Sequence, residues 1–292
     1  LTDVGTAGNQ IPTNADLDGK NLFINGGFDI WQRGETFTDN GYTADRWGLF
    51  KAAGVMTLTK SDVTPNILGD GRLRLETTTI DVDAQIYQKI ENVRTLQGKT
   101  ATLSFWVYTS DNFQVQAKHS FGTGSATTQR IFHDAVTTGV IAATWSKVTM
   151  EITVPELLVT DDVNADNFLQ VTLFIGANLG NTYIKDVKLE EGSAATPFST
   201  QGSSIGEELV LCGRYYQKST YAPVLKQYVT GRKLIDVIFP TTMRAVPSMV
   251  INRSGYTSDS LVVAAGGFQD ADFTALTASA SSITSWTADA EL

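Results

Sequence analysis

Histidine and cysteine, two residue types that often carry hydrolytic catalysis, are scarce in the chain. There are two histidines, His119 and His133, and one cysteine, Cys212. His133 precedes Asp134, but a nucleophilic triad needs a nucleophile, a base and an orienting acid together, and the spacing indicates none. One cysteine and two histidines also cannot complete a usual structural zinc set. We therefore expect no catalytic residues, no enzyme activity and no cofactor-binding residues.

Two short patterns copy part of a ligand-binding motif and then depart from it. Gly98-Lys-Thr100 ends like a phosphate-binding P-loop, but Val93 stands where the motif requires glycine. Asp162-Val-Asn-Ala-Asp166 begins like an EF-hand calcium loop, but Asn167 and Leu173 stand where glycine and glutamate are required. We therefore expect neither a nucleotide site nor an EF-hand.

Aromatic side chains are the residues best suited to bind a ligand. The chain has five Trp, nine Tyr and fourteen Phe. Aromatic faces stack on the C–H faces of sugars, so rings that are not buried predict carbohydrate binding. Trp106 lies opposite Phe105 on a predicted strand, and it either packs on a second covered face or is exposed for binding. The expected carbohydrate-binding residues are Tyr221, Tyr228, Tyr256, Trp286 and Trp106.

The composition limits the kinds of partner that the chain can bind. Charged residues make up 18% of its 292 residues, against a usual share of about 25%. The formal net charge is −9 without a cluster of Lys and Arg, which disfavours nucleic acids and anionic membrane surfaces. We find no apolar run of about 18 residues and no signal-peptide order at the start, so no membrane insertion is expected.

Short apolar bursts between Gly and Asn turns predict many strands. In Thr100–Tyr108, the residues Ala101, Leu103, Phe105 and Val107 share one face. Such period-two alternation without alternating helices is typical of an antiparallel sandwich or barrel, so the predicted fold class is all-β. The other expected strands are Met150–Val154, Val171–Ile175, Tyr183–Leu189 (with Tyr183, Val187 and Leu189 on one face), Leu234–Phe239, Pro247–Ile251, Ser260–Ala264 and Ser282–Ala288.

One helix is expected after a linker of Ser, Ala, Thr and Gly at 193–204. Ser204 and Glu207 have the spacing of a capping box. Apolar residues then recur at helical spacing, which predicts a helix over about 205–217. Its apolar face would contain Ile205, Leu209, Cys212 and Tyr216, with Cys212 as a small buried hydrophobe.

Several blocks of the sequence, taken in order, resemble bacteriophage tail fibres that carry a jelly-roll domain like a carbohydrate-binding module. The blocks are Gly8–Asp16, Asn21–Gly34, Tyr42–Trp47, Asp186–Gly192 with Thr196–Phe198, Gly206–Tyr216, and Phe239–Pro240 with Met243–Pro247. With the strand pattern, the resemblance implies a jelly-roll β-sandwich followed by a short helix and a smaller C-terminal β-domain. The expected boundaries are an extended arm at 1–20, the jelly roll at 21–200, linker and helix at 201–218, and the β-rich tip at 219–292.

The resemblance also implies partners. It implies a homotrimer in the virion, joined to other tail proteins through the arm, that binds a bacterial surface polysaccharide outside the cell. The subunit contacts would come from the helix, through Ile205, Leu209, Cys212 and Tyr215. Related jelly rolls hold a structural Ca²⁺ between the first and last strands, and Asp29 and Asp186 are the candidates for it here.

Two other functions fit the same sequence. The chain could be the lectin-like, carbohydrate-binding module of a secreted enzyme that degrades polysaccharides. It could also be a head or decoration fibre of a virion. A catalytic domain on a longer gene product would favour the first alternative, and attachment to the head would favour the second.

Overall fold

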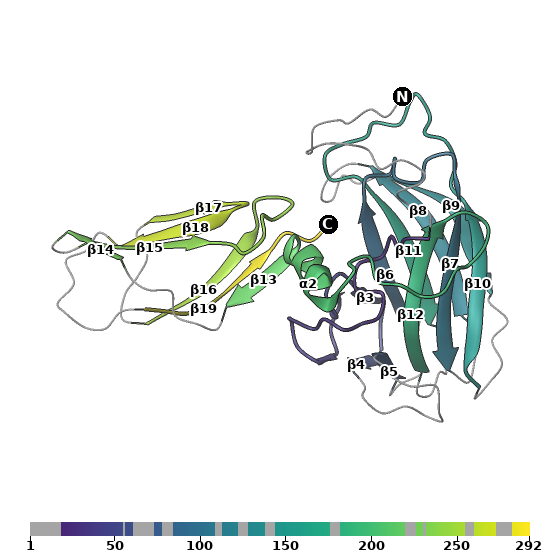
Figure 1. Ribbon diagram of the computed structural model, residues 1–292, viewed down its shortest axis with the longest axis horizontal. Helices are drawn as coiled ribbons and strands as arrows, with labels where there is room; N and C mark the ends of the chain where they lie inside the picture. The colour runs from purple at the N-terminus through teal and green to yellow at the C-terminus, as the bar shows by residue number, and fades with distance from the viewer. Residues whose placement is uncertain are drawn as a thin grey trace.

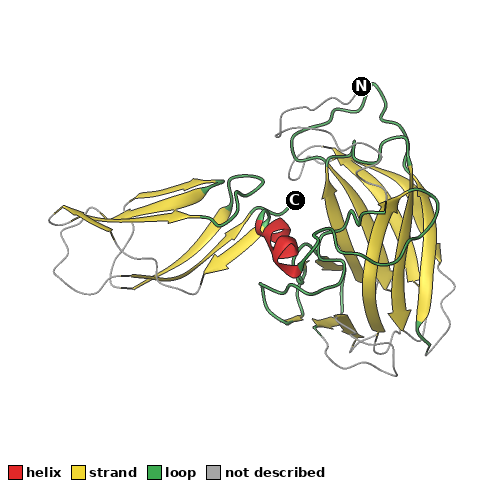
Figure 2. Cartoon of the chain, viewed as in Figure 1, coloured by secondary structure: helices red, strands yellow, loops and turns green. Residues whose placement is uncertain are grey.

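The computed structural model describes residues 19–54, 56–60, 73–77, 84–108, 113–121, 128–137, 144–175, 182–219, 226–229, 232–254, 260–272 and 282–292. Within these ranges the chain is built of β-strands and one short helix, as the sequence predicts (Figures 1 and 2). No helix in the described ranges is long and apolar enough to cross a membrane.

Two sheets of six strands form the N-terminal sandwich, and their described pairings are antiparallel. In spatial order, sheet A contains β1 (Thr36–Phe37), β4 (Met56–Thr59), β5 (Leu73–Thr77), β12 (Thr182–Glu191), β7 (Thr100–Tyr108) and β10 (Ser146–Thr153). Sheet B contains β2 (Gly41–Tyr42), β3 (Gly48–Lys51), β6 (Ala84–Glu91), β11 (Phe168–Ile175), β8 (Phe113–Phe121) and β9 (Thr128–Thr137).

The hydrophobic core lies between sheets A and B. On β7 the four residues that the alternation selects, Ala101, Leu103, Phe105 and Val107, are all buried in this core. Burying one such side chain contributes roughly 1.5–3 kcal/mol, so a core of this extent can stabilise the sandwich without a disulfide. Strands β6, β8 and β11 contribute Ile86, Ile90, Val115, Ala117, Leu169, Val171 and Leu173.

Strand β12 departs from simple alternation. Its pairing with β7 shifts between Lys185 and Lys188, and Asp186 between them has a φ of 54°. This β-bulge moves the side chains before it to the opposite face. Ile184 therefore joins Val187 and Leu189 in the core, and the prediction that Tyr183 would share their face is wrong.

The helix α2 (Ile205–Gly213) begins where the sequence predicts. Ser204 is its N-cap, and the Ser204 hydroxyl accepts a hydrogen bond from the Glu207 amide. It ends before 217, however, because the Tyr215 carbonyl accepts from the Ala290 amide and strand β13 (Tyr216–Ser219) starts there. Pairing with the C-terminal strand overrides the helical spacing of Tyr216.

The buried face of α2 differs in part from the expected one. Cys212 is buried, as predicted, but Ile205 and Leu209 are exposed by 60% and 47%, and Glu208 is buried instead. Val210 is also exposed, by 53%. The Glu208 carboxylate accepts hydrogen bonds from the backbone amides of Asn25 and Gly202. These two bonds compensate the burial of a charge and fix the helix against the sandwich.

Two smaller sheets form the C-terminal domain. One contains β13, β19 (Ser282–Asp289) and β16 (Ser248–Ser254), and the other contains β14 (Lys226–Val229), β15 (Arg232–Ile238), β18 (Gly267–Asp272) and β17 (Ser260–Ala264). Their core includes Phe239, Met243, Phe268, Ile283 and Trp286. Figure 1 shows α2 between this domain and the sandwich.

Candidate functional site

The outer face of sheet B contains polar side chains from several neighbouring strands. Because alternate residues of β6, β8 and β11 fill the core, the residues between them face outward. We call this surface the polar face. Its members are Tyr42, Tyr87, Lys89, Gln116, Lys118, Ser120, Phe168, Gln170 and Thr172.

Gln170 lies at the middle of the polar face. It pairs with Lys89 of β6 on one side and with Lys118 of β8 on the other. Its side-chain amide donates to the Thr172 hydroxyl at 2.9 Å, and both residues are buried by their neighbours. These two groups bond to each other beneath the surface, and the half-buried Gln116, in register with Thr172, has the amide that can exchange hydrogen bonds with the hydroxyls of a sugar.

Aromatic rings border these polar groups. Tyr87 packs against Gly48, where an added Cβ would lie 2.3 Å from the Tyr87 Cζ atom, so a larger residue would displace the ring. Tyr42 approaches Tyr87 edge-on with centroids 6.4 Å apart. On the other side the Lys89 ammonium lies 4.5 Å from the centroid of Phe168. The polar face thus combines rings with hydrogen-bonding groups, as sugar-binding surfaces do.

The charged groups of the polar face are partly desolvated. Burial and the nearby positive charges of Arg46, Lys118 and Arg244 lower the pKa of Lys89 to about 8, against the opposing effect of Glu291. Burial also lowers the pKa of Lys118. Charges in such surroundings are screened less by water than surface charges, so they act more strongly on a bound group.

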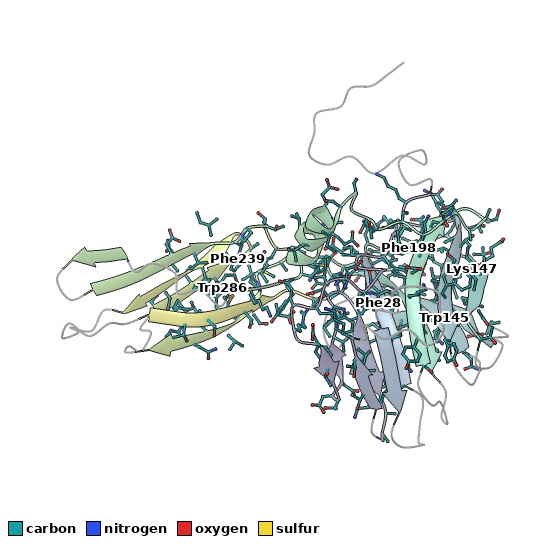
Figure 3. All side chains as sticks on the ribbon, turned by 60° about the horizontal axis from the view of Figure 1, so that its bottom comes forward. Phe28, Trp145, Lys147, Phe198, Phe239 and Trp286 are labelled. Atoms are coloured by element: carbon teal, nitrogen blue, oxygen red, sulfur yellow. The ribbon has the colours of Figure 1, made fainter. Side chains whose placement is uncertain are left out.

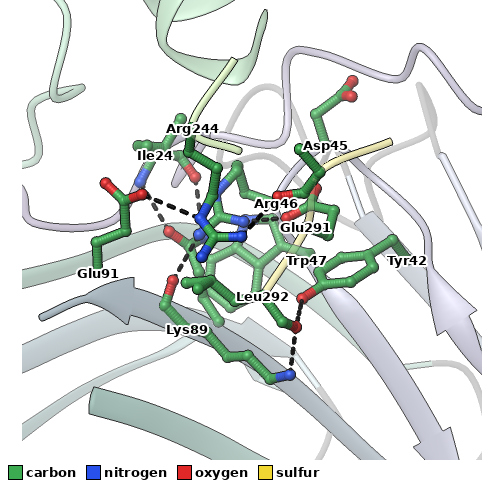
Figure 4. A network of polar contacts seen from close by, with 12 residues as sticks. Ile24, Tyr42, Asp45, Arg46, Trp47, Lys89, Glu91, Arg244, Glu291 and Leu292 are labelled. Atoms are coloured by element: carbon green, nitrogen blue, oxygen red, sulfur yellow. Dashed lines mark hydrogen bonds and ion pairs between the residues drawn. The ribbon is translucent and has the colours of Figure 1, made fainter. Parts of the chain in front are cut away.

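A buried ion-pair network joins the sandwich to the C-terminal domain beside the polar face (Figure 4). Arg46 is buried, pairs with the Glu291 carboxylate, and donates to the Lys89 carbonyl. Its guanidinium also lies 3.4 Å from the centroid of the Tyr215 ring. The Leu292 carbonyl accepts from the Lys89 ammonium and, at 3.0 Å, from the Tyr42 hydroxyl.

Asp45 is the carboxylate that burial perturbs most clearly in this network. Burial raises its pKa to about 6, although the Gln32 amide donates to it at 2.7 Å and Arg33 lies 3.5 Å away. Arg33 also pairs with Asp289 at 2.9 Å, and its guanidinium lies 3.7 Å from the Tyr216 ring centroid. The network therefore includes charged groups from both domains.

Arg244 makes a second connection across the junction. It pairs with Glu91 at 3.2 Å and with Asp166 at 2.6 Å, and it donates to the Ala290 carbonyl at 3.1 Å. Arg214 also pairs with Glu91, at 3.1 Å. These contacts hold the C-terminal domain against the end of β6, next to Lys89.

Trp106 lies on the opposite side of the sandwich, on the outer face of sheet A. It pairs with Lys147 and Lys185 of the flanking strands and is half-buried. Tyr108 and Trp145 lie nearby with centroids 5.9 Å apart, and Figure 3 shows Trp145 and Lys147 on the sandwich, far from Trp286. The Trp106 side chain is therefore partly exposed, as its predicted role in sugar binding requires.

The other predicted sugar-binding rings do not gather with Trp106. Trp286 is buried in the C-terminal core, because β19 turns Ile283 and Trp286 inward. The ring centroids of Trp286 and Phe239 lie 5.3 Å apart. The prediction of Trp286 as a sugar contact is therefore wrong, since its ring faces are covered by protein. Tyr221 and Tyr256, like the arm up to residue 18, lie outside the described residues, and of Tyr228 only the backbone is described.

Two of the expected subunit contacts are buried within the chain. Cys212 and Tyr215 pack with Ile24 and Ile30 beneath α2, so neither can contact another subunit. Burial raises the pKa of the Cys212 thiol and that of the Tyr215 hydroxyl, the latter to about 12. Ile205 and Leu209 remain exposed on the helix.

The residues that resemble catalytic groups have structural contacts. Gly202–Gly206 has the Gly-x-Ser-x-Gly spacing of a nucleophile elbow, but Ser204 caps α2. His119 is buried against Phe132, and burial lowers its pKa to about 4. These groups serve packing and capping in this fold.

Asp29 and Asp186 lie in segments that pack together, since the Val187 amide donates to the Gly26 carbonyl at 2.9 Å. Among the described residues, no group of three or more His, Cys, Asp or Glu side chains could hold a metal ion. Calcium takes six to eight oxygen ligands, and two carboxylates are few for it. The calcium site stays a prediction.

The sequence contains a signal for the polar face that we did not use. Ala84–Glu91 reads Ala-Gln-Ile-Tyr-Gln-Lys-Ile-Glu, in which Gln85, Tyr87, Lys89 and Glu91 alternate with buried residues. A strand with one core face and one face of Tyr, Gln and Lys predicts a polar surface. Which strands pair with it, and hence which residues complete the face, depends on the topology.

Comparisons with known proteins support no family assignment. No family model and no curated protein matches the chain. Among solved structures, the enzymatically active domain of tailspike protein 4 from bacteriophage CBA120 matches with a TM-score of 0.38 and 14% identity. The match covers 59% of this chain and 21% of that one, so this chain spans about a fifth of that structure's length.

Carbohydrate-binding modules also match. TmCBM61, solved in complex with β-1,4-galactotriose, has a TM-score of 0.33 and 14% identity, over 59% of this chain and 99% of the module. A CBM4 structure has a TM-score of 0.35 and 20% identity, over 57% and 98%. At these TM-scores the matches carry no argument about the function of this chain.

Proposed function

We propose that the chain is a non-catalytic, carbohydrate-binding protein that acts as the receptor-binding part of a phage tail fibre. The observation that carries the binding role is the polar face, where Tyr87 borders the ordered amide of Gln170 and the half-buried Gln116. Rings that stack on sugars next to groups that bond their hydroxyls are the usual means of recognising a glycan.

The tail-fibre role is supported by the resemblance of the ordered sequence blocks to such fibres. In this role the arm attaches to other tail proteins and the chain binds a bacterial surface polysaccharide outside the cell. A homotrimer would present several copies of the polar face together, so weak sugar contacts would sum to firm attachment. The exposed apolar side chains of Ile205, Leu209 and Val210 on α2 favour a contact between copies.

Sedimentation tests the trimer. The protein is expected to have a mass near three times 31.6 kDa, and Leu209→Glu is expected to shift it toward the monomer. A wild-type protein that sediments as a monomer at micromolar concentration would contradict the trimer and leave the carbohydrate site to be tested separately.

The same polar face would serve a carbohydrate-binding module of a secreted polysaccharide-degrading enzyme, which is the alternative function. Adsorption separates the two: the purified chain is expected to compete with a phage for host cells if it belongs to a tail fibre. Binding to polysaccharide without such competition would favour the enzyme module.

Titration of oligosaccharides prepared from bacterial surface polysaccharide tests the binding role. Tyr87→Ala is expected to weaken binding at least about tenfold, or about 1.4 kcal/mol, because it removes the stacking ring. Gln116→Ala removes a hydrogen-bonding group and is expected to weaken it less. Thr149→Ala, an exposed residue on the outer face of sheet A, is the matched control and is expected to bind as the wild type does.

Unfolding of each variant is measured alongside, since Tyr87 also packs on Gly48. If Gln116→Ala and Tyr87→Ala both fold and bind every saccharide as the wild type does, the polar face is not the binding site. If Trp106→Ala alone abolishes binding, the site lies on sheet A.

A further inference from the structure

The polar face contains a pair of positive side chains in a chain whose net charge is −9. Lys89 and Lys118 project from the strands on either side of β11, both in register with Gln170. Strands in a sheet lie about 4.8 Å apart, so the two Cα atoms are about 10 Å apart and a single sugar fits between the side chains.

Neither lysine forms an ion pair with an Asp or Glu side chain of the described residues. The Lys89 ammonium donates to the backbone oxygen of Leu292, and the Lys118 ammonium donates at 2.9 Å to the side-chain oxygen of Gln129. The Glu291 carboxylate, which acts on Lys89, is already engaged by Arg46 and Arg33. Both ammonium groups can therefore take a carboxylate or phosphate of a ligand without breaking an ion pair to an Asp or Glu side chain.

We propose that Lys89 and Lys118 bind the anionic substituent of an acidic saccharide, a carboxylate or a phosphate, above Gln170. This inference rests on the proposed carbohydrate-binding function and names the class of sugar. The lowered pKa values of both lysines agree with it, because an anion between them would relieve the cost of holding two ammonium groups in partly desolvated positions.

A matched pair of ligands tests the charge requirement. Oligogalacturonate carries carboxylates, and its methyl ester is the neutral analogue of the same size and shape. The wild-type protein is expected to bind the acid at least tenfold more tightly than the ester at low salt, and this preference should shrink as salt is raised. A phosphate-substituted oligosaccharide and its unsubstituted form make the second arm, and the arm with the larger preference identifies the substituent.

Three lysine variants test which side chain supplies the positive charge that binds the acidic saccharide. Lys118→Met is expected to lose the preference for the acid, measured as the ratio of the dissociation constants for ester and acid. Lys118→Arg keeps the charge and is expected to keep the preference, which guards against a merely misfolded methionine variant. Lys147→Met removes an exposed lysine from the opposite face and is expected to behave as the wild type does.

The outcomes separate this inference from the proposed function. Equal binding of charged and neutral ligands in both arms, or a preference that Lys118→Met does not change, overturns the inference and leaves carbohydrate binding intact. Absence of binding to every saccharide tested overturns both.

Discussion

At the scale of single residues, buried polar and titratable side chains matter more to this protein than its tryptophans. Trp286 and Trp47 are buried in the cores, whereas Gln170, Lys89 and Lys118 form the ordered surface that can bind a ligand. Among the buried groups, Asp45 and His119 respond to pH in opposite senses. Asp45, whose pKa is raised to about 6, stabilises the fold below pH 4, and this contribution is lost as pH rises through 6.

His119 is expected to make the fold sensitive to acid. Its folded pKa of about 4 lies below its unfolded value of about 6.5, so the unfolded chain binds a proton first and stability falls as pH drops from 6.5 to 4. Relative to His119→Gln, the wild type is expected to lose unfolding free energy across this window in denaturant titrations. The contribution of Asp45 cancels in this difference.

His133→Gln is the control for that measurement. His133 is half-buried and its pKa is also lowered by burial, so a smaller effect of the same sign is expected. A constant difference between wild type and His119→Gln from pH 7 to pH 4 would show that His119 is not held neutral in the fold.

At the scale of elements, local signals predict where strands and the helix begin, but not what they contact. The alternation in Thr100–Tyr108 predicts both β7 and its core face, and Ser204 with Glu207 predicts the start of α2. The face of β12 could not be predicted, because the bulge at Asp186 becomes visible only in its pairing with β7. The end of α2 likewise depends on Tyr215, which pairs with a segment 75 residues later in the chain, at Ala290.

Glu208 is expected to anchor α2. Glu208→Ala leaves the amides of Asn25 and Gly202 without partners in a buried site, so it is expected to cost roughly 1–3 kcal/mol of unfolding free energy. Glu207→Ala is the matched control, since that exposed carboxylate accepts from the Ser203 amide at 2.7 Å in the first turn, and it is expected to cost less than about 1 kcal/mol. Equal costs in urea titrations would show that Glu208 is not an anchor.

At the scale of the whole molecule, three of the sequence blocks, Asn21–Gly34, Tyr42–Trp47 and Gly206–Tyr216, meet at the junction of the two domains. The Asn25 amide donates to the Glu208 carboxylate, the Trp47 indole donates to the Asn25 carbonyl at 2.9 Å, and Arg46 packs on Tyr215. These blocks therefore supply residues that join the sandwich to the C-terminal domain. The polar face could not be assembled from the sequence, because its three strands are far apart in the chain and come together only through sheet B.

The Arg46–Glu291 pair is expected to couple the two domains. Arg46→Met leaves Glu291 buried without its closest partner, which typically costs about 3–5 kcal/mol. Calorimetry is expected to show one unfolding transition for the wild type and two for this variant. Lys60→Met, which removes an exposed pair with Glu35, is the control and is expected to change stability by less than about 1 kcal/mol. A single transition in Arg46→Met would contradict the coupling.

Amide hydrogen exchange with and without a bound saccharide tests the central claim that the chain binds glycans on sheet B. Our account predicts that the ligand slows exchange in β6, β8 and β11, around Gln170, and leaves β7 and β10 unchanged. Slower exchange in β7 and β10, or only in the C-terminal sheets, would contradict the assignment of the site to the polar face.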